Sequence, residues 1–131
     1  MDKALKKIVR QIQACVGNRI EFIVLFGSRA QGTPLPISDM DIGVKVSASE
    51  KEYSKLQLEL AGLITSDTLP RTDFVLLDAA SLTLKYRVIR DGKLLYQRNP
   101  DVWPTFVEEV LSRYPDWKIY LDHYLAEAVG V

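Results

Sequence analysis

Hydrophobic residues in the first half of the chain follow first a helical and then a strand-like spacing. Near the start they recur every three or four positions, which predicts a helix ending at Gly17-Asn18 with this apolar face: Leu5, Ile8, Val9, Ile12 and Cys15. A nearly continuous apolar run at 20–26 predicts a strand buried on both faces. Strict alternation at 39–46 predicts a second strand, whose core-facing residues are Met40, Ile42, Val44 and Val46.

The middle of the chain predicts two further helices and two further strands. Residues 49–52 have the form of a capping box and open a helix with this inner face: Tyr53, Leu56, Leu60, Leu63 and Ile64. Residues 71–78 are strand-like, and 93–97 form a short strand or extended piece. Between them a helix is predicted to start at Ser81 and to close at Asp91-Gly92, with these residues inward: Leu82, Tyr86 and Ile89.

Beyond residue 100 the pattern becomes helical and aromatic. Pro115 separates two stripes, because a proline inside a helix kinks or ends it. The first stripe is Trp103, Phe106, Val107, Val110, Leu111 and Tyr114, and the second is Trp117, Tyr120, Leu121, Tyr124, Leu125 and Ala128. Such stripes are typical of a core, whereas their richness in tryptophan and tyrosine is also typical of a partner-binding surface.

Composition narrows the function classes. The 131 residues are 47% hydrophobic, which suffices for a core without disulfides. With 17 basic and 17 acidic residues there is no excess of positive charge for a nucleic-acid surface, and Lys3, Lys6, Lys7 and Arg10 read as a solvated helix face. A single cysteine, Cys15, and the lack of an apolar stretch long enough for a membrane predict a cytoplasmic protein. The lone His123 has no triad-like setting.

A glycine and a serine directly follow the first predicted strand. Gly27 lets the backbone approach a bound group because it has no Cβ, and Ser28 at a helix start offers a hydroxyl and unpaired backbone N–H groups to a phosphate. Arg29 either adds a charge contact or points outward. The pair indicates a phosphate site, although a glycine–serine pair is also typical of a simple turn.

Two carboxylates lie on the polar face of the second predicted strand. Asp39 and Asp41 are roughly 6.5–7 Å apart along it, so they repel each other unless a cation lies beside them. Mg²⁺ prefers such hard oxygen ligands, together with substrate phosphates. The alternative is that Asp39 caps a turn and Asp41 is a solvated strand residue. For a third carboxylate we choose Asp73, at the start of the next strand, over Asp78, which reads as a turn or helix-start residue.

These motifs together resemble a known family. Gly27-Ser28, ten residues, Asp39-x-Asp41 and the later Asp73 are similar to the polymerase-β-type nucleotidyltransferase superfamily. The fuller string Gly-Ser-Arg-Ala-x-Gly…Ser-Asp-x-Asp resembles its minimal nucleotidyltransferase (MNT) branch, and the resemblance covers about 20–98. The sequence departs from the pattern at Gln31, where many members carry a basic residue.

The resemblance implies a fold and a site. The fold would be α+β (α/β), a small mixed β-sheet flanked by helices, in one domain (1–131) with a catalytic core (1–98) and a C-terminal helical extension (101–129). Mg²⁺ would be held by catalytic residues Asp39, Asp41 and Asp73, and the phosphates of ATP by Gly27, Ser28 and Arg29.

The resemblance also implies a partner. MNT proteins commonly act as antitoxins that transfer AMP from ATP to a tyrosine of a HEPN-domain ribonuclease toxin and so silence it. Two alternatives stay open at this point. One is an antitoxin that neutralises by binding alone, and the other is a nucleotidyltransferase that acts on small molecules, as aminoglycoside-modifying relatives do.

Overall fold

A four-stranded sheet forms the centre of the molecule. The computed structural model describes residues 3–27, 40–63 and 72–113. Its elements are α1 (Lys3–Val16), the 3₁₀ turn η1 (Gly17–Arg19), β1 (Ile20–Phe26), β2 (Met40–Val46), α2 (Glu50–Ala61), β3 (Thr72–Leu76), the 3₁₀ turn η2 (Leu77–Ala79), α3 (Leu82–Asp91) and β4 (Lys93–Gln97). Residues 102–113 are also helical.

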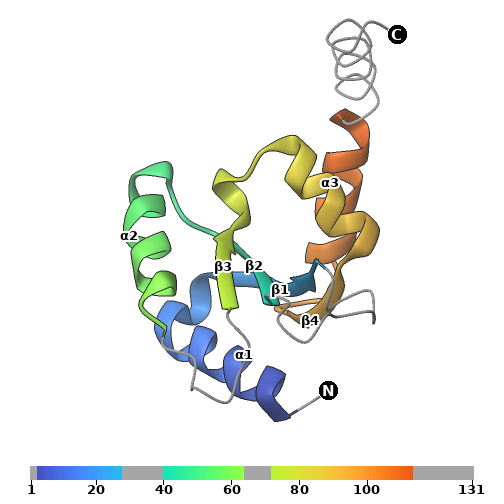
Figure 1. Cartoon of the computed structure of the whole chain (residues 1–131). Coiled ribbons are helices and arrows are strands. Elements are labelled where there is room, and N and C mark those ends of the chain that lie inside the picture. The colour runs from blue at the N-terminus through green and yellow to red at the C-terminus, as the bar shows by residue number, and fades with distance from the viewer. Residues whose placement is uncertain (1–2, 28–39, 64–71, 114–131) are drawn as a thin grey trace, which may run out of the picture.

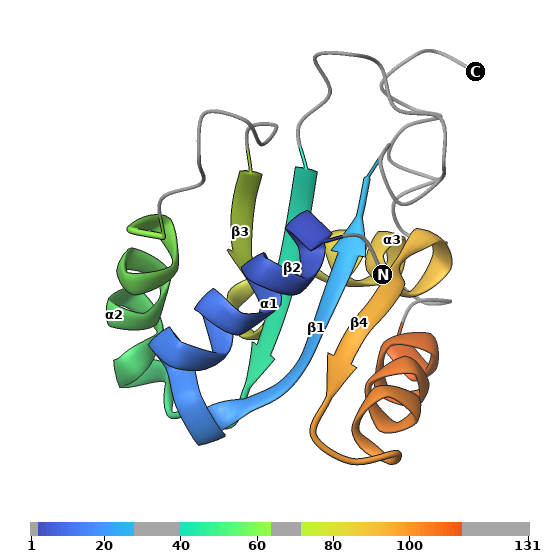
Figure 2. The ribbon, with the colours of Figure 1, turned by 90° about the horizontal axis from the view of Figure 1, so that it is seen from below.

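The sheet is mixed, with the strand order β3-β2-β1-β4. β1 is antiparallel to both β2 and β4, whereas β2 and β3 run parallel because α2 carries the chain back between them. In Figure 2, the C-terminal end of β1 therefore lies at the top of the sheet, beside the N-terminal ends of β2 and β3.

Helices cover both faces of the sheet. α1 and α2 lie on one side, and α3 and the 102–113 helix lie on the other (Figure 1). The alternation of β1 divides its side chains between the two layers, since Ile23 and Leu25 pack toward α1 and α2 while Phe22, Val24 and Phe26 pack toward α3. The central strand is thus buried on both faces, as its apolar run predicts.

The helix at 102–113 packs against the sheet through aromatic rings. Phe22 meets Trp103 and Phe106 edge to face, with ring centroids 5.0 and 4.9 Å apart. Val110 is buried beside them, while Leu111 is 48% exposed. The first part of the aromatic stripe therefore belongs to the core. The second stripe, at 117–128, lies outside the described residues.

Most of the predicted elements are confirmed, and the α+β class with a mixed sheet is confirmed with them. The prediction of a capping box is wrong. The helix α2 does begin after Ser49, but the serine side chain makes no cap hydrogen bond. The Glu52 side chain forms an ion pair with Arg19 at 3.2 Å instead. In α3 the fully buried residue is Val88, which the predicted inner face omits.

Candidate active site

Asp41 and Asp73 lie side by side at one end of the sheet. They are direct register partners in the parallel pairing of β2 with β3. Partners on neighbouring strands share a face, and the strands lie about 4.8 Å apart, so both carboxylates project from the α3 side of the sheet. Asp73 is exposed and Asp41 is half-buried. The structure therefore brings together two of the three predicted acids.

Gly27 lies against the same carboxylate. It follows Phe26, the register partner of Asp41 on β1, and its backbone has a φ of +84°. That left-handed conformation strains any residue with a Cβ. A Cβ at this position would also overlap Oδ2 of Asp41. The turn after β1 therefore requires glycine for two reasons, and it places the backbone of Gly27 directly beside the acid.

The other predicted site residues lie outside the described residues. These are Ser28, Arg29 and Asp39, together with the variant position Gln31. Within residues 3–27, 40–63 and 72–113, no group of three or more acidic, histidine or cysteine side chains could hold a metal ion. The carboxylates that the structure places together in the candidate site are the pair formed by Asp41 and Asp73.

This donor set fits Mg²⁺. Two carboxylates on adjacent strands supply hard oxygen ligands, and their mutual repulsion favours a cation between or beside them. Mg²⁺ is usually held by one or two carboxylates while water and substrate phosphates complete its shell, so two such residues are enough to fit the ion. An exposed Asp73 leaves this face accessible to a substrate.

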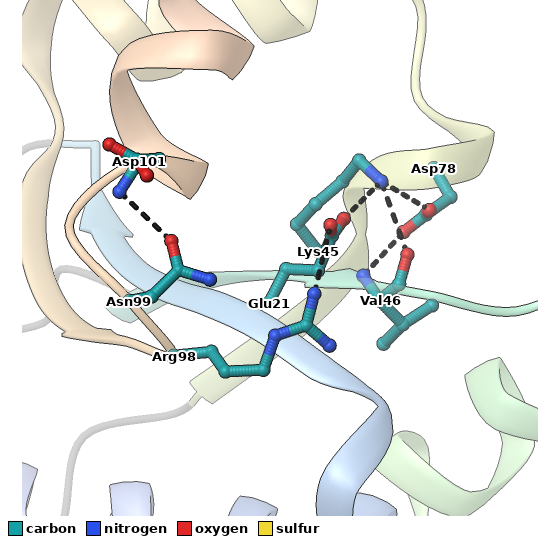
Figure 3. A network of polar contacts seen from close by, with 7 residues as sticks. All are labelled: Glu21, Lys45, Val46, Asp78, Arg98, Asn99 and Asp101. Atoms are coloured by element: carbon teal, nitrogen blue, oxygen red, sulfur yellow. Dashed lines mark hydrogen bonds and ion pairs between the residues drawn. The ribbon is translucent and has the colours of Figure 1, made fainter.

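Asp78 lies at the opposite end of the sheet. It follows β3, in η2, and binds Lys45 and the backbone of Val46 at the end of β2 (Figure 3). Lys45 is four residues beyond Asp41 on the same strand face, which corresponds to about 13 Å along the strand. Asp78 is thus the turn residue that the sequence indicates, and its carboxylate is remote from the Asp41–Asp73 pair.

A polar network around Lys45 was not identified from the sequence. Its Nζ donates to Glu21 Oε2 at 2.8 Å, to Asp78 Oδ2 at 2.9 Å and to the carbonyl of Val46 at 3.1 Å. The available signal was Glu21, an isolated charge inside an apolar strand. A charge at such a position is stable there only when an opposite charge lies nearby.

The pKa of Lys45 is raised above its ordinary value of 10.5. Burial alone would lower the pKa, but hydrogen bonds and ion pairs with Glu21 and Asp78 outweigh burial. Because the folded pKa exceeds the unfolded one, these ion pairs stabilise the protein fully below pH 10.5 and lose their effect as the pH rises through the folded pKa.

We expect Lys45→Met to lower the free energy of unfolding by about 2 kcal/mol at pH 8, since two carboxylates lose their shared cation. The difference between the variant and the wild type should shrink above pH 10.5. Urea unfolding of both proteins at pH 8 and pH 11 measures it. A difference that is unchanged at pH 11 would show that packing of the lysine stem, rather than its charge, stabilises the fold.

A cavity of about 370 Å³ lies beside this network and not beside Asp41. Its walls include Glu21, Phe22 and Lys45 from the sheet, together with Asp101 and Glu109 from the segment after β4. The carboxylate pair at the other end of the sheet does not contribute to it. We therefore base the candidate active site on the register of the strands and the contact with Gly27, and not on this cavity.

The single cysteine of the chain, Cys15, is half-buried on α1. Burial and the nearby Glu59 raise the pKa of the Cys15 thiol, against the opposing effect of Arg19, so it stays protonated on the core side of α1.

Among the helices in the described part of the chain, none has the length and apolar character needed to cross a membrane.

A family of known proteins matches most of the chain. The family model described as polymerase beta, nucleotidyltransferase matches residues 6–101. That range contains the sheet, the glycine turn and both carboxylates. No curated protein matches the chain.

Solved structures of similar fold include toxin–antitoxin complexes. A chain from a toxin–antitoxin structure with AMP-PNP is 27% identical, with a TM-score of 0.74 over 95% of this chain and 98% of that one. A chain from a mutant of the toxin–antitoxin MntA-HpeT is 26% identical, with a TM-score of 0.73 over 95% and 96%. A chain from the tri-AMPylated Shewanella oneidensis HEPN toxin in complex with MNT antitoxin is 23% identical, with a TM-score of 0.70 over 96% of each chain.

Proposed function

The chain belongs to the polymerase beta nucleotidyltransferase family, and we propose that it is an Mg²⁺-dependent adenylyltransferase antitoxin that transfers AMP from ATP to a tyrosine of a HEPN-domain toxin. The observation that supports this most directly is the pairing of Asp41 with Asp73 beside Gly27. The toxin–antitoxin relative with AMP-PNP, similar over almost its whole length, supports the choice of nucleotide and partner.

Each residue of the proposed site has a distinct role. Asp41 and Asp73, with Asp39, would hold Mg²⁺, whose chemistry is to neutralise charge on the phosphates of ATP. Gly27 and Ser28 would hold the β- and γ-phosphates through backbone N–H groups and the serine hydroxyl, and Arg29 would add a positive charge. Asp73 is the exposed member of the described pair, which supports its assignment as the carboxylate that meets an acceptor from another protein.

The proposed reaction is a single displacement at phosphorus. The tyrosine oxygen of the toxin attacks the α-phosphorus, and a new oxygen–phosphorus bond forms while the bond to the bridging oxygen breaks. Pyrophosphate leaves, and Asp73 accepts the tyrosine proton. Positioning of the two reactants and stabilisation of the developing charge accelerate the transfer, as in other phosphoryl-transfer reactions.

Transfer is tested with the purified chain, its HEPN partner, Mg²⁺ and ATP labelled in the α- or the γ-phosphate. We expect the toxin to acquire α-label and no γ-label, and its ribonuclease activity to fall as label accumulates. Mass spectrometry of the toxin then identifies the acceptor residue and counts the AMP groups. Label from γ-ATP would indicate a kinase, and absence of both labels with an intact complex would reject the proposed transfer.

A further inference from the structure

The relative position of β2 and β3 decides whether Asp41 faces Asp73. The pairing is short, running from Met40↔Thr72 to Val44↔Leu76, and β3 is one of the two edge strands of the sheet. Side chains alternate with a period of two. A slip of one residue would therefore expose the apolar face, but a slip of two residues would keep it toward the core. It would also separate the two carboxylates by about 6.6 Å along the strand.

Asp78 makes the contacts that distinguish the observed register from such a slip. Its Oδ1 accepts a hydrogen bond from the backbone N–H of Val46 at 2.9 Å, and its Oδ2 accepts one from Lys45 Nζ at 2.9 Å. The Asp78 side chain is only 4% exposed. Backbone N–H groups point the same way at every second residue, so after a slip of two residues another N–H would take the place of that of Val46. The slip would, however, set Gly43 or Ser47 where Lys45 lies, and the buried carboxylate would lose the cation beside it. Such a loss is costly.

The same network extends to the other strands. Lys45 also binds Glu21 on β1, and Glu21 Oε1 lies 3.5 Å from Arg98 Nη2, directly after β4 (Figure 3). The backbone N–H of Arg98 donates to the carbonyl of Glu21 at 2.8 Å. Polar contacts thus link all four strands at the end of the sheet that lies opposite the carboxylate pair.

We propose that Asp78 is a positioning residue, which holds β2 and β3 in the register that sets Asp41 opposite Asp73. The proposal rests on the proposed function for its effect on catalysis. Asp78 acts through the strands, because it lies at the end of the sheet opposite to the carboxylates. Its loss should therefore weaken metal binding and slow transfer in molecules that remain folded.

The test compares Asp78→Ala, Asp78→Asn and the control Glu52→Gln. Asp78→Ala removes both contacts, while Asp78→Asn keeps an oxygen for the Val46 N–H and loses the charge opposite Lys45. Glu52→Gln breaks an ion pair with Arg19 on the protein surface, which has no part in the β2–β3 pairing. All are measured at a temperature at which circular dichroism and urea unfolding show them to be folded.

We expect Asp78→Ala to lower kcat at least tenfold and to raise the Mn²⁺ concentration for half-saturation several-fold in the presence of AMP-PNP. Asp78→Asn should lie between Asp78→Ala and the wild type, and Glu52→Gln should match the wild type. A merely structural role would lower the unfolding midpoint and leave kcat and Mn²⁺ affinity of the folded protein unchanged, which would overturn the proposal. If Asp78→Ala does not fold, Asp78→Asn decides by the same criteria.

Binding of Mn²⁺, followed by electron paramagnetic resonance, separates this proposal from the proposed function. If the wild type binds Mn²⁺ with AMP-PNP but transfers nothing to the toxin, the proposed function fails. Weaker Mn²⁺ binding by the Asp78 variants would then still support the positioning role. If the wild type binds no Mn²⁺, the positioning proposal is wrong together with the metal site.

Discussion

Replacing Asp41 with asparagine (Asp41→Asn) is expected to lower the rate of AMP transfer at least about 1000-fold, which corresponds to about 4 kcal/mol of transition-state stabilisation. Asp41 is the half-buried member of the carboxylate pair, between Gly27 on one side and Asp73 on the other. An amide of the same shape keeps the packing and removes the negative charge. The metal would then lose a ligand that the proposed mechanism needs in the transition state.

The fold should survive this change. Like charges on neighbouring strands repel each other. In the absence of Mg²⁺, loss of one charge should therefore raise the free energy of unfolding by about 0–1 kcal/mol. Asp101→Asn is the matched control, because Asp101 is exposed and lies near the Lys45 end of the sheet. It should transfer AMP at the wild-type rate. Transfer by Asp41→Asn above a tenth of the wild-type rate would contradict the assigned role.

The same variant separates enzymatic from purely steric neutralisation. In cells that express the HEPN toxin, Asp41→Asn should fail to restore growth even where it still binds the toxin. Co-purification of the two chains measures that binding. Full protection by a variant without transfer activity would favour the alternative in which the antitoxin acts by binding alone.

Gly27→Ala should have the second large effect, a loss of both stability and activity. Alanine would strain the backbone at φ +84°, and its Cβ would overlap Oδ2 of Asp41. Left-handed strain and overpacking together should cost about 2–4 kcal/mol in the free energy of unfolding. Because the overlap displaces the Asp41 carboxylate, transfer by the folded fraction should fall at least about 100-fold, and small displacements at a reacting centre are known to have effects of this size.

Gly17→Ala isolates the backbone contribution. Gly17 also has a positive φ, +72°, but a Cβ there would meet nothing within 4 Å. The Gly17→Ala variant should therefore lose about 1–2 kcal/mol in the free energy of unfolding, while its transfer rate per folded molecule stays at the wild-type value. Urea unfolding and initial rates of α-label incorporation measure both variants. Equal losses of activity in the two would show that backbone strain, and not the contact with Asp41, explains the requirement for glycine at position 27.

The elements themselves could be predicted from local patterns. The continuous apolar run of β1 indicated a strand buried on both faces, and alternation in β2 placed Ile42, Val44 and Val46 in the core. Ser81 and Gly92 bound α3 as expected, and Ser81 does accept the cap hydrogen bond from Leu84. These signals are reliable because each depends on residues a few positions apart, whose burial or capping is a local consequence of helix or strand geometry.

The site required more than periodicity. Asp41 was recognisable as a polar-face residue of its strand, and the choice of Asp73 over Asp78 followed from its position at the start of a strand. The sequence could not show that Gly27 touches Asp41, because that contact depends on how β1 pairs with β2. It also could not show that Asp78 binds Lys45 and Val46, which are more than 30 residues earlier in the chain.

By itself, then, the sequence determined which segments are helices and strands, which of their faces are apolar and which residue types are available for metal and phosphate. The tertiary structure decided that Asp41 lies opposite Asp73, that Gly27 must lack a Cβ, and that Asp78 binds Lys45 and Val46 at the far end of the sheet. The physical reason is that β2 and β3 are parallel and joined through a helix, so no tight turn dictates their register. It is set by contacts between residues that are distant in the chain.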